Sequence, residues 1–173
     1  MTASNLFKLF LLCSIAFSFM QCSEDEEQRD FEQMALRPPS GIVAMSANGT
    51  PVEDGESDPD DWRIAPEFLG IFIIETAAFP NPVAFNSSFE ILISINSFQA
   101  VNGLRIFAFQ QPSQMGAALI QETGPLNIGV RSIRLSPQQF ASSTGTGNVG
   151  DLYRIIIYDG RGDVISYGDV QIE

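Results

Sequence analysis

The chain has 173 residues, which is enough for one domain of ordinary size, and 45% of them are apolar, which is enough to build a core. Twenty-one acidic residues outnumber nine basic ones, so the formal net charge is -12, and such a surface would repel nucleic acid. The sequence contains no histidine, which excludes His-dependent triads, His general bases and His-ligated metal sites. The only cysteines are Cys13 and Cys22, so the body of the chain has no disulfide and no Cys-ligated metal.

The first residues have the pattern of an export leader. Lys8 is followed by twelve uncharged residues, LFLLCSIAFSFM, a length that suits a signal peptide and is shorter than the ~20 residues of a membrane-spanning helix. Two processing routes are compatible with it. General signal peptidase could cut after residues 16–18, which would leave Cys22 as an ordinary thiol. Lipoprotein signal peptidase would instead cut before Cys22, once its sulfur carries a diacylglyceryl group, although Gln21 departs from the small residue usual there.

Two features of Cys22 favour the lipid route. It stands at the end of the leader in a chain that has no later cysteine, so neither packing nor redox chemistry explains it. Residues 23–27, Ser-Glu-Asp-Glu-Glu, resemble the Ser-plus-acidic run that follows the lipidated cysteine in surface-exported lipoproteins of the Bacteroidota. The resemblance implies an outer-membrane lipoprotein with signal peptide 1–21, anchored by palmitate-type acyl chains on Cys22. It leaves open which face of the membrane holds the protein.

Residues 22–66 are expected to form a disordered, flexible acidic tether. Twelve carboxylates fall between Glu24 and Asp61, in a stretch rich in Pro, Ser and Gly. Only residues 41–45, GIVAM, are apolar enough to add an edge strand. The acidic run 54–61 does not have the spacing of a calcium loop, so a solvated linker is expected there rather than a metal site. The acidic residues could be recognised by the export machinery, or they could form a soluble spacer.

Residues 67–173 are predicted to form a single all-β domain. Eight short apolar runs are separated by turn residues: GIFIIETAAF, FEILISINSF, LRIFAFQ, AALIQE, IGVRSIRL, LYRIIIYD, DVISY and DVQIE. This regular spacing of apolar runs and turns predicts an antiparallel Ig-like β-sandwich of about seven to eight strands. Residues 136–140, SPQQF, are predicted to form one helical turn with Ser136 as N-cap. A turn at residues 159–163 would account for the tripeptide Arg161-Gly162-Asp163 without integrin-type recognition.

A second resemblance rests on two short motifs. Residues 78–83, AFPNPV, resemble the PNP motif that opens the Ig-like C-terminal sorting domains of type IX secretion substrates. Residues 150–155 with Gly160 resemble the Gly-then-Tyr strand and turn that close those domains. The resemblance implies an Ig-like sandwich and, as one alternative, a type IX sorting-type domain. Asn81, held between two prolines, is expected to bond its own backbone and to make a rigid start to the first core strand.

The function expected from the sequence is that of a non-enzymatic, membrane-anchored envelope lipoprotein that acts as a small binding or assembly module. Its partners would be the membrane, through the lipid on Cys22, and an envelope protein or a glycan, with no nucleic acid and no cofactor. The alternative is a secreted or surface carbohydrate-binding or adhesion module. In that module the aromatic residues Trp62, Tyr153, Tyr158 and Tyr167 would stack on sugar rings.

Catalysis is not expected. Glycosidase chemistry needs two facing carboxylates, and the strand pattern brings together no two of the isolated acids Glu75, Glu90, Glu122 and Asp151. A serine nucleophile would have no histidine partner, and no phosphate-binding glycine loop is present. No catalytic, cofactor or metal residue is therefore predicted, and Cys22 is the one predicted site.

Overall fold

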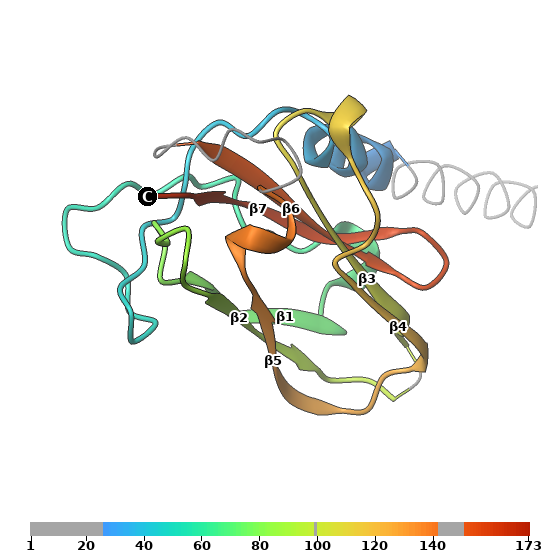
Figure 1. Cartoon of the computed structure of the whole chain (residues 1–173). Coiled ribbons are helices and arrows are strands. Elements are labelled where there is room, and N and C mark those ends of the chain that lie inside the picture. Colours follow the sequence, from blue (N-terminus) through green and yellow to red (C-terminus); the bar gives the residue numbers. More distant parts are fainter. Residues whose placement is uncertain (1–25, 99, 142–150) are drawn as a thin grey trace, which may run out of the picture.

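The described residues, 26–98, 100–141 and 151–173 of a computed structural model, form two antiparallel sheets packed face to face (Figure 1). The three-stranded sheet has the order β1-β2-β5 and the four-stranded sheet the order β4-β3-β6-β7. The strands are β1 (Phe72–Phe79), β2 (Phe89–Ile95), β3 (Asn102–Phe109), β4 (Ile120–Pro125), β5 (Gly129–Leu135), β6 (Leu152–Asp159) and β7 (Val164–Gln171). The order matches strands A-B-E and C′-C-F-G of an Ig-like sandwich, so the predicted fold class is confirmed.

Seven strands form from the eight predicted runs because the last two runs join into β7. The described residues also form three short 3-10 helices: η1 (Pro66–Phe68) before β1, η2 (Pro112–Gln114) between β3 and β4, and η3 (Pro137–Gln139) after β5. The helical turn predicted at residues 136–140 is confirmed by η3. There the Ser136 amide donates to Oε1 of Gln139 at 2.7 Å, which satisfies one of the unpaired amides at the helix start.

The core lies between the two sheets and follows the alternation seen in the sequence. Phe89, Ile91, Ile93 and Ile95 of β2 are all fully buried and project from one face of that strand. Leu104 and Ile106 of β3 are buried in the same way in the four-stranded sheet. Each large apolar side chain that is fully buried stabilises the fold by ~1.5–3 kcal/mol, so this double row dominates the packing of the sandwich.

Strands β6 and β7 are buried on both faces, which requires a cover on the outer side of their sheet. Ile155, Ile156 and Ile157 are successive residues of β6, so they alternate between the two faces, yet all three are fully buried. The cover is the segment before η1. It begins with a helix at residues 26–35, and the Phe31 ring of this helix lies 5.1 Å from the Tyr167 ring of β7.

The flexible tether predicted at residues 22–66 is therefore wrong for residues 26–66, the part that the structure describes. Apolar side chains spread through this acidic segment are buried in the fold: Phe31, Ala35, Ile42, Met45, Trp62 and Ala65. Acidic composition alone suggested a solvated chain, but the apolar outer face of β6 and β7 gives these side chains a place to pack. The predicted boundary at residue 67 does not separate a tether from a domain.

Residues 41–45 and Asn81 form a joint between the N-terminal segment and the sandwich. The predicted edge strand is reduced to isolated bridges, one of which joins Met45 to Asn81. Asn81 is fully buried, and its amide nitrogen donates to the carbonyls of Val43 at 3.2 Å and Asp169 at 2.9 Å. The PNP segment thus follows β1 instead of opening the first strand, and Asn81 bonds two other segments instead of its own backbone.

The register of the strands defines two ends of the sandwich. Phe72 pairs with Ile95, and Ile95 pairs with Gly129, so the start of β1, the end of β2 and the start of β5 lie together. We call this the proximal end, and it comprises residues 69–71, 96–98, 126–128 and 160–163. Helix 26–35 begins beside it, since the Gln28 side chain donates to the carbonyl of Val164 at 3.4 Å. The distal end holds η2, η3 and the start of β6.

Candidate functional site

A cavity of about 480 Å³ lies at the distal end, between the β3–β4 connection, η3 and the start of β6. Its lining residues are of three kinds and carry no formal charge. They are the aromatic Phe109, Phe140 and Tyr153, the amides Gln110, Gln114 and Gln139, and the small or aliphatic Ala108, Gly116, Ala117, Ala118 and Leu119. A volume in this range, with apolar walls and a few polar groups, is typical of small-molecule sites.

The aromatic floor of this distal cavity is part of the core and is therefore rigid. Phe140 packs on Tyr153 with ring centroids 5.0 Å apart and on Phe89 of β2 at 6.5 Å. Phe109 and Tyr153 are each only 2% exposed. The glutamines project from the connections above this floor, where their side-chain amides supply donors and acceptors without a charge. The cavity can hold an uncharged ligand that has both apolar faces and hydrogen-bonding groups.

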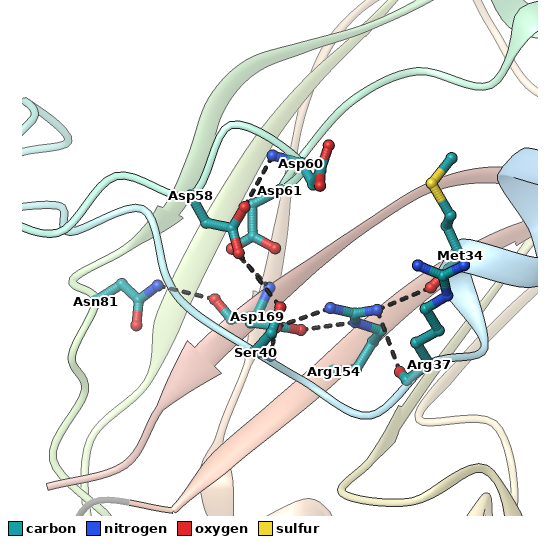
Figure 2. A network of polar contacts seen from close by, with 9 residues as sticks. All are labelled: Met34, Arg37, Ser40, Asp58, Asp60, Asp61, Asn81, Arg154 and Asp169. Atoms are coloured by element: carbon teal, nitrogen blue, oxygen red, sulfur yellow. Dashed lines mark hydrogen bonds and ion pairs between the residues drawn. The ribbon is translucent and has the colours of Figure 1, made fainter.

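A second cluster of functional groups lies between the four-stranded sheet and the N-terminal segment that covers it (Figure 2). Arg154 of β6 and Asp169 of β7 are register partners, and their side chains form a bidentate ion pair with N–O distances of 2.7 and 2.8 Å. The exposed fractions of these side chains are 4% and 0%, so the pair is shielded from water. Nη1 of Arg154 also donates to the carbonyls of Met34 at 3.0 Å and Arg37 at 3.1 Å.

Asp61 joins this ion pair from the acidic segment. Its Oδ2 accepts a hydrogen bond from the Asp169 amide at 3.1 Å, while its Oδ1 is buried with no partner among the described residues. Burial, together with repulsion from the Asp169 carboxylate, raises the pKa of Asp61 from 3.8 to about 8. Asp61 is therefore mostly protonated at neutral pH. The three residues hold the N-terminal segment on the sheet and leave no opening for a substrate.

The residues predicted to stack on sugars do not form an exposed aromatic strip. Trp62, Tyr153 and Tyr167 are 7%, 2% and 2% exposed, which is too little for ring stacking, and this part of the prediction is wrong. Tyr158 is half-buried against Phe107, with ring centroids 5.6 Å apart. Of these four aromatic residues, Tyr153 is the one that lines the distal cavity. Tyr and Trp rings carry a polar atom that favours a position at the surface, but here the rings are buried by packing.

The isolated carboxylates of the sandwich make separate contacts. Glu75 accepts from Ser94 at 2.6 Å, and Glu90 accepts from Ser132 at 2.7 Å. Glu122 pairs with Arg131 at 2.7 Å. Asp151 lies just before β6, and its backbone carbonyl accepts from the amide of Ile172. Each of these four residues is thus engaged with a different partner.

The acidic run 54–61 is a folded loop, where a solvated linker was expected. Glu56 accepts from the amide of Ile42 at 3.3 Å, and Asp58 accepts from the amide of Asp60 at 2.9 Å. Over the described ranges, no three Asp, Glu, His or Cys residues gather in a way that could hold a metal ion. The same ranges contain no helix long and apolar enough to cross a membrane. Cys22, the predicted lipid site, lies outside the described residues.

Comparison with known proteins gives no family for this chain. No known protein family matches it, and no curated protein does. One similar solved structure is a mutant β-glucosidase from Listeria innocua in complex with laminaribiose, at 16% sequence identity and a TM-score of 0.39. The match covers 59% of this chain and 16% of the glucosidase chain. Similarity of this degree carries no functional argument.

No sequence motif indicated the distal cavity. It forms where the β3–β4 connection, η3 and the start of β6 meet, and its glutamines come from two segments about 30 residues apart. The helix that contacts Arg154, by contrast, has a recognisable sequence pattern. Phe31, Met34 and Ala35 are spaced as one face of a helix, a pattern that favours a packed helix over a tether.

Proposed function

We propose that this chain is a membrane-anchored, non-enzymatic binding module that takes a small uncharged ligand in the distal cavity. The observation that carries the proposal is the lining of that cavity, in which the described residues combine apolar side chains with three glutamine amides and include no charged side chain. In a chain with a net charge of -12, a cavity whose described lining has no carboxylate and no arginine favours a neutral ligand.

The chemistry of the lining narrows the ligand class. The apolar lining favours apolar faces of a ligand, and the side-chain amides favour its hydroxyl or amide groups. Neutral sugars and N-acetylated sugars have both kinds of surface. The carbohydrate-binding alternative thus remains as a form of this proposal, with the distal cavity replacing the four aromatic residues first predicted.

The anchor is proposed from the sequence. A lipid on Cys22 would hold the protein in the outer membrane, because two or three acyl chains anchor firmly when each buried methylene contributes ~0.8 kcal/mol. A non-enzymatic role is supported by three of the isolated carboxylates, since Glu75 and Glu90 each accept from a serine and Glu122 pairs with an arginine. A type IX sorting-type domain is a weaker candidate, because the PNP segment lies between β1 and β2 and is used in packing.

Ligand binding can be tested by saturation-transfer NMR with glucose, N-acetylglucosamine and glucuronate as probes. We expect signal transfer to the two neutral probes and none to glucuronate, because the cavity offers no cation to pair with its carboxylate. Ala118→Trp should abolish the transfer by filling the cavity. Ala47→Trp places the same ring on an exposed turn and is the matched control. Equal transfer in both variants would place binding elsewhere.

The anchor is tested by the intact mass of the mature protein extracted from membranes. We expect a chain that starts at Cys22 and carries two or three acyl chains. Cys22→Ser should lose both the added mass and the membrane association. A mature chain that starts near Phe19 with a free thiol would remove the anchored reading and favour a secreted module.

A further inference from the structure

The exposed apolar side chains of this protein are concentrated at the proximal end. Among the described residues the four most exposed large hydrophobics are Leu69, Phe98, Ile128 and Val130, at 66%, 62%, 57% and 68%. They come from three separate parts of the chain. In the rest of the described chain the largest exposed fraction of such a side chain is 45%, at Val52.

The sheet register explains why these four residues gather. Leu69 precedes β1, Phe98 follows β2, and Ile128 precedes β5, while these strand ends are neighbours because Ile95 pairs with both Phe72 and Gly129. Val130 pairs with Ser94 one step further along the sheet. Clusters of exposed apolar residues on a folded protein mark surfaces that contact a membrane or another protein. We call these four residues the apolar end.

The chain leads from the apolar end toward the predicted lipid. Gln28 is fixed there, since its side chain donates to the carbonyl of Val164 and accepts from the amide of Glu67. Glu26 is the fourth residue after Cys22, and four residues can span at most about 14 Å. Figure 1 shows helix 26–35 starting on the same side as the turn between β6 and β7. A lipid on Cys22 would therefore hold this end against the bilayer.

We infer that the apolar end rests on the membrane surface, with Leu69, Phe98 and Ile128 entering the lipid interface. The inference builds on the proposed anchor at Cys22. The occupant is the lipid surface because the helix that begins beside the proximal end starts within about 14 Å of chain from Cys22, so an anchor there brings this end close to the bilayer. Since the distal cavity lies at the other end, this placement points it away from the bilayer and toward ligands on the open side.

The charges near the apolar end indicate the kind of lipid contact. The nearby acids Glu27, Glu67 and Asp163 outnumber the bases Arg29 and Arg161, so these residues form no basic patch. Binding would therefore depend on burial of apolar side chains and would not need anionic lipid. Vesicles of pure phosphatidylcholine are a sufficient probe.

The test uses the mature lipidated chain in phosphatidylcholine vesicles. No cysteine follows Cys22, and its thiol is consumed by the lipid, so one introduced cysteine gives a single labelling position. We would attach an environment-sensitive dye to Phe98→Cys, to Ile128→Cys and, as the control, to Val52→Cys in the loop beside Ala44. The expected result is a blue shift and quenching by spin-labelled lipid at positions 98 and 128, with neither at position 52.

Two results would overturn the inference. One is a polar environment at positions 98 and 128 in a protein whose mass confirms the lipid. The other is a blue shift that fades as the number of chains per vesicle is reduced, because that dependence assigns the apolar end to a second copy. Absence of the acyl mass is a different outcome, since it contradicts the proposed anchor itself. The mass measurement therefore separates failure of the anchor from failure of the membrane contact.

Discussion

Arg154 and Asp169 face each other across β6 and β7 and form a bidentate ion pair that is almost completely shielded from water. The same guanidinium donates to the carbonyls of Met34 and Arg37 at the end of helix 26–35 (Figure 2). Those carbonyls carry the negative end of the helix dipole, so a fixed cation is favourable there. One side chain thus joins the N-terminal helix to the sheet.

Replacement of Arg154 should be strongly destabilising. Arg154→Ala leaves the Asp169 carboxylate buried without its cation, a change that costs roughly 3–5 kcal/mol in comparable buried pairs. Arg134→Ala is the matched control, because Arg134 is 70% exposed and its nearest Glu90 oxygen lies at 3.7 Å. Exposed pairs contribute about 0–1 kcal/mol. Urea unfolding of both variants measures the difference, and similar midpoints would show that the buried pair has no special role.

Stability should depend on pH through Asp61. The folded chain keeps the proton on this carboxyl up to about pH 8, whereas its pKa in the unfolded chain is near 3.8. Between these values the folded state binds more protons, so the free energy of unfolding contributed by Asp61 falls as pH rises. The slope is at most ~1.4 kcal/mol per pH unit.

Asp61→Asn removes this titration and keeps an oxygen to accept from the Asp169 amide. Its stability relative to the wild type should therefore increase from about pH 5 to about pH 8. Urea titrations of both proteins across that range give the comparison. The groups that face Asp61 and set its titration are Asp169, Asp58 and Arg154. A constant difference between the two proteins would mean that Asp61 ionises normally in the folded chain.

Gly168 of β7 is required by the indole of Trp62. A Cβ added at Gly168 would lie 2.2 Å from Cε2 of that ring, closer than any real contact allows. Gly168→Ala should therefore push residues 61 and 62 away from the sheet and cost at least ~1–3 kcal/mol. Gly116→Ala is the control because a Cβ there meets nothing within 4 Å. Thermal melts of the two variants should differ by several degrees, and equal melting temperatures would contradict this packing.

The strands were predictable because each depends on a local pattern. The alternation of Phe89, Ile91, Ile93 and Ile95 is visible in the sequence and survives unchanged in the fold. The cover at residues 26–66 was missed because acidic residues dominate its average composition, although Phe31, Met34 and Ala35 have helical spacing. Trp62 was predicted to be exposed because nothing local shows that Gly168, a hundred residues away, makes room for its ring.

The N-terminal cover should be necessary for folding. Removing residues before Glu67 deletes four large buried side chains, Phe31, Ile42, Met45 and Trp62. At ~1.5–3 kcal/mol each, their loss approaches or exceeds the ~5–15 kcal/mol of a typical domain. A fragment that starts at Glu67 should show no cooperative unfolding by circular dichroism, whereas one that starts at Glu26 should unfold cooperatively. A folded fragment from Glu67 would restore the boundary predicted from the sequence.

Asp159 organises the turn between β6 and β7. Its Oδ1 accepts from the amides of Arg161, Gly162 and Asp163 at 2.8–3.0 Å, and its Oδ2 accepts from the Arg161 side chain at 2.9 Å. Burial opposes ionisation of Asp159, but these hydrogen bonds outweigh it and lower its pKa below the usual range. The tripeptide at residues 161–163 is therefore held in a fixed turn.

Asp159→Ala should cost about 1–3 kcal/mol, because three turn amides lose their acceptor. The pKa of Asp159 is lower in the folded chain than in the unfolded chain. The charged carboxylate therefore stabilises the fold fully at pH values above the unfolded pKa, and this stabilisation is lost as pH falls through the folded pKa. The difference in unfolding free energy between wild type and Asp159→Ala should therefore be constant from about pH 5 to pH 7 and shrink below about pH 4. Asp163→Ala, which changes a partly exposed carboxylate of the same turn, is the control. If its loss equals that of Asp159→Ala at neutral pH, the turn depends on surface charge and not on the buried acceptor.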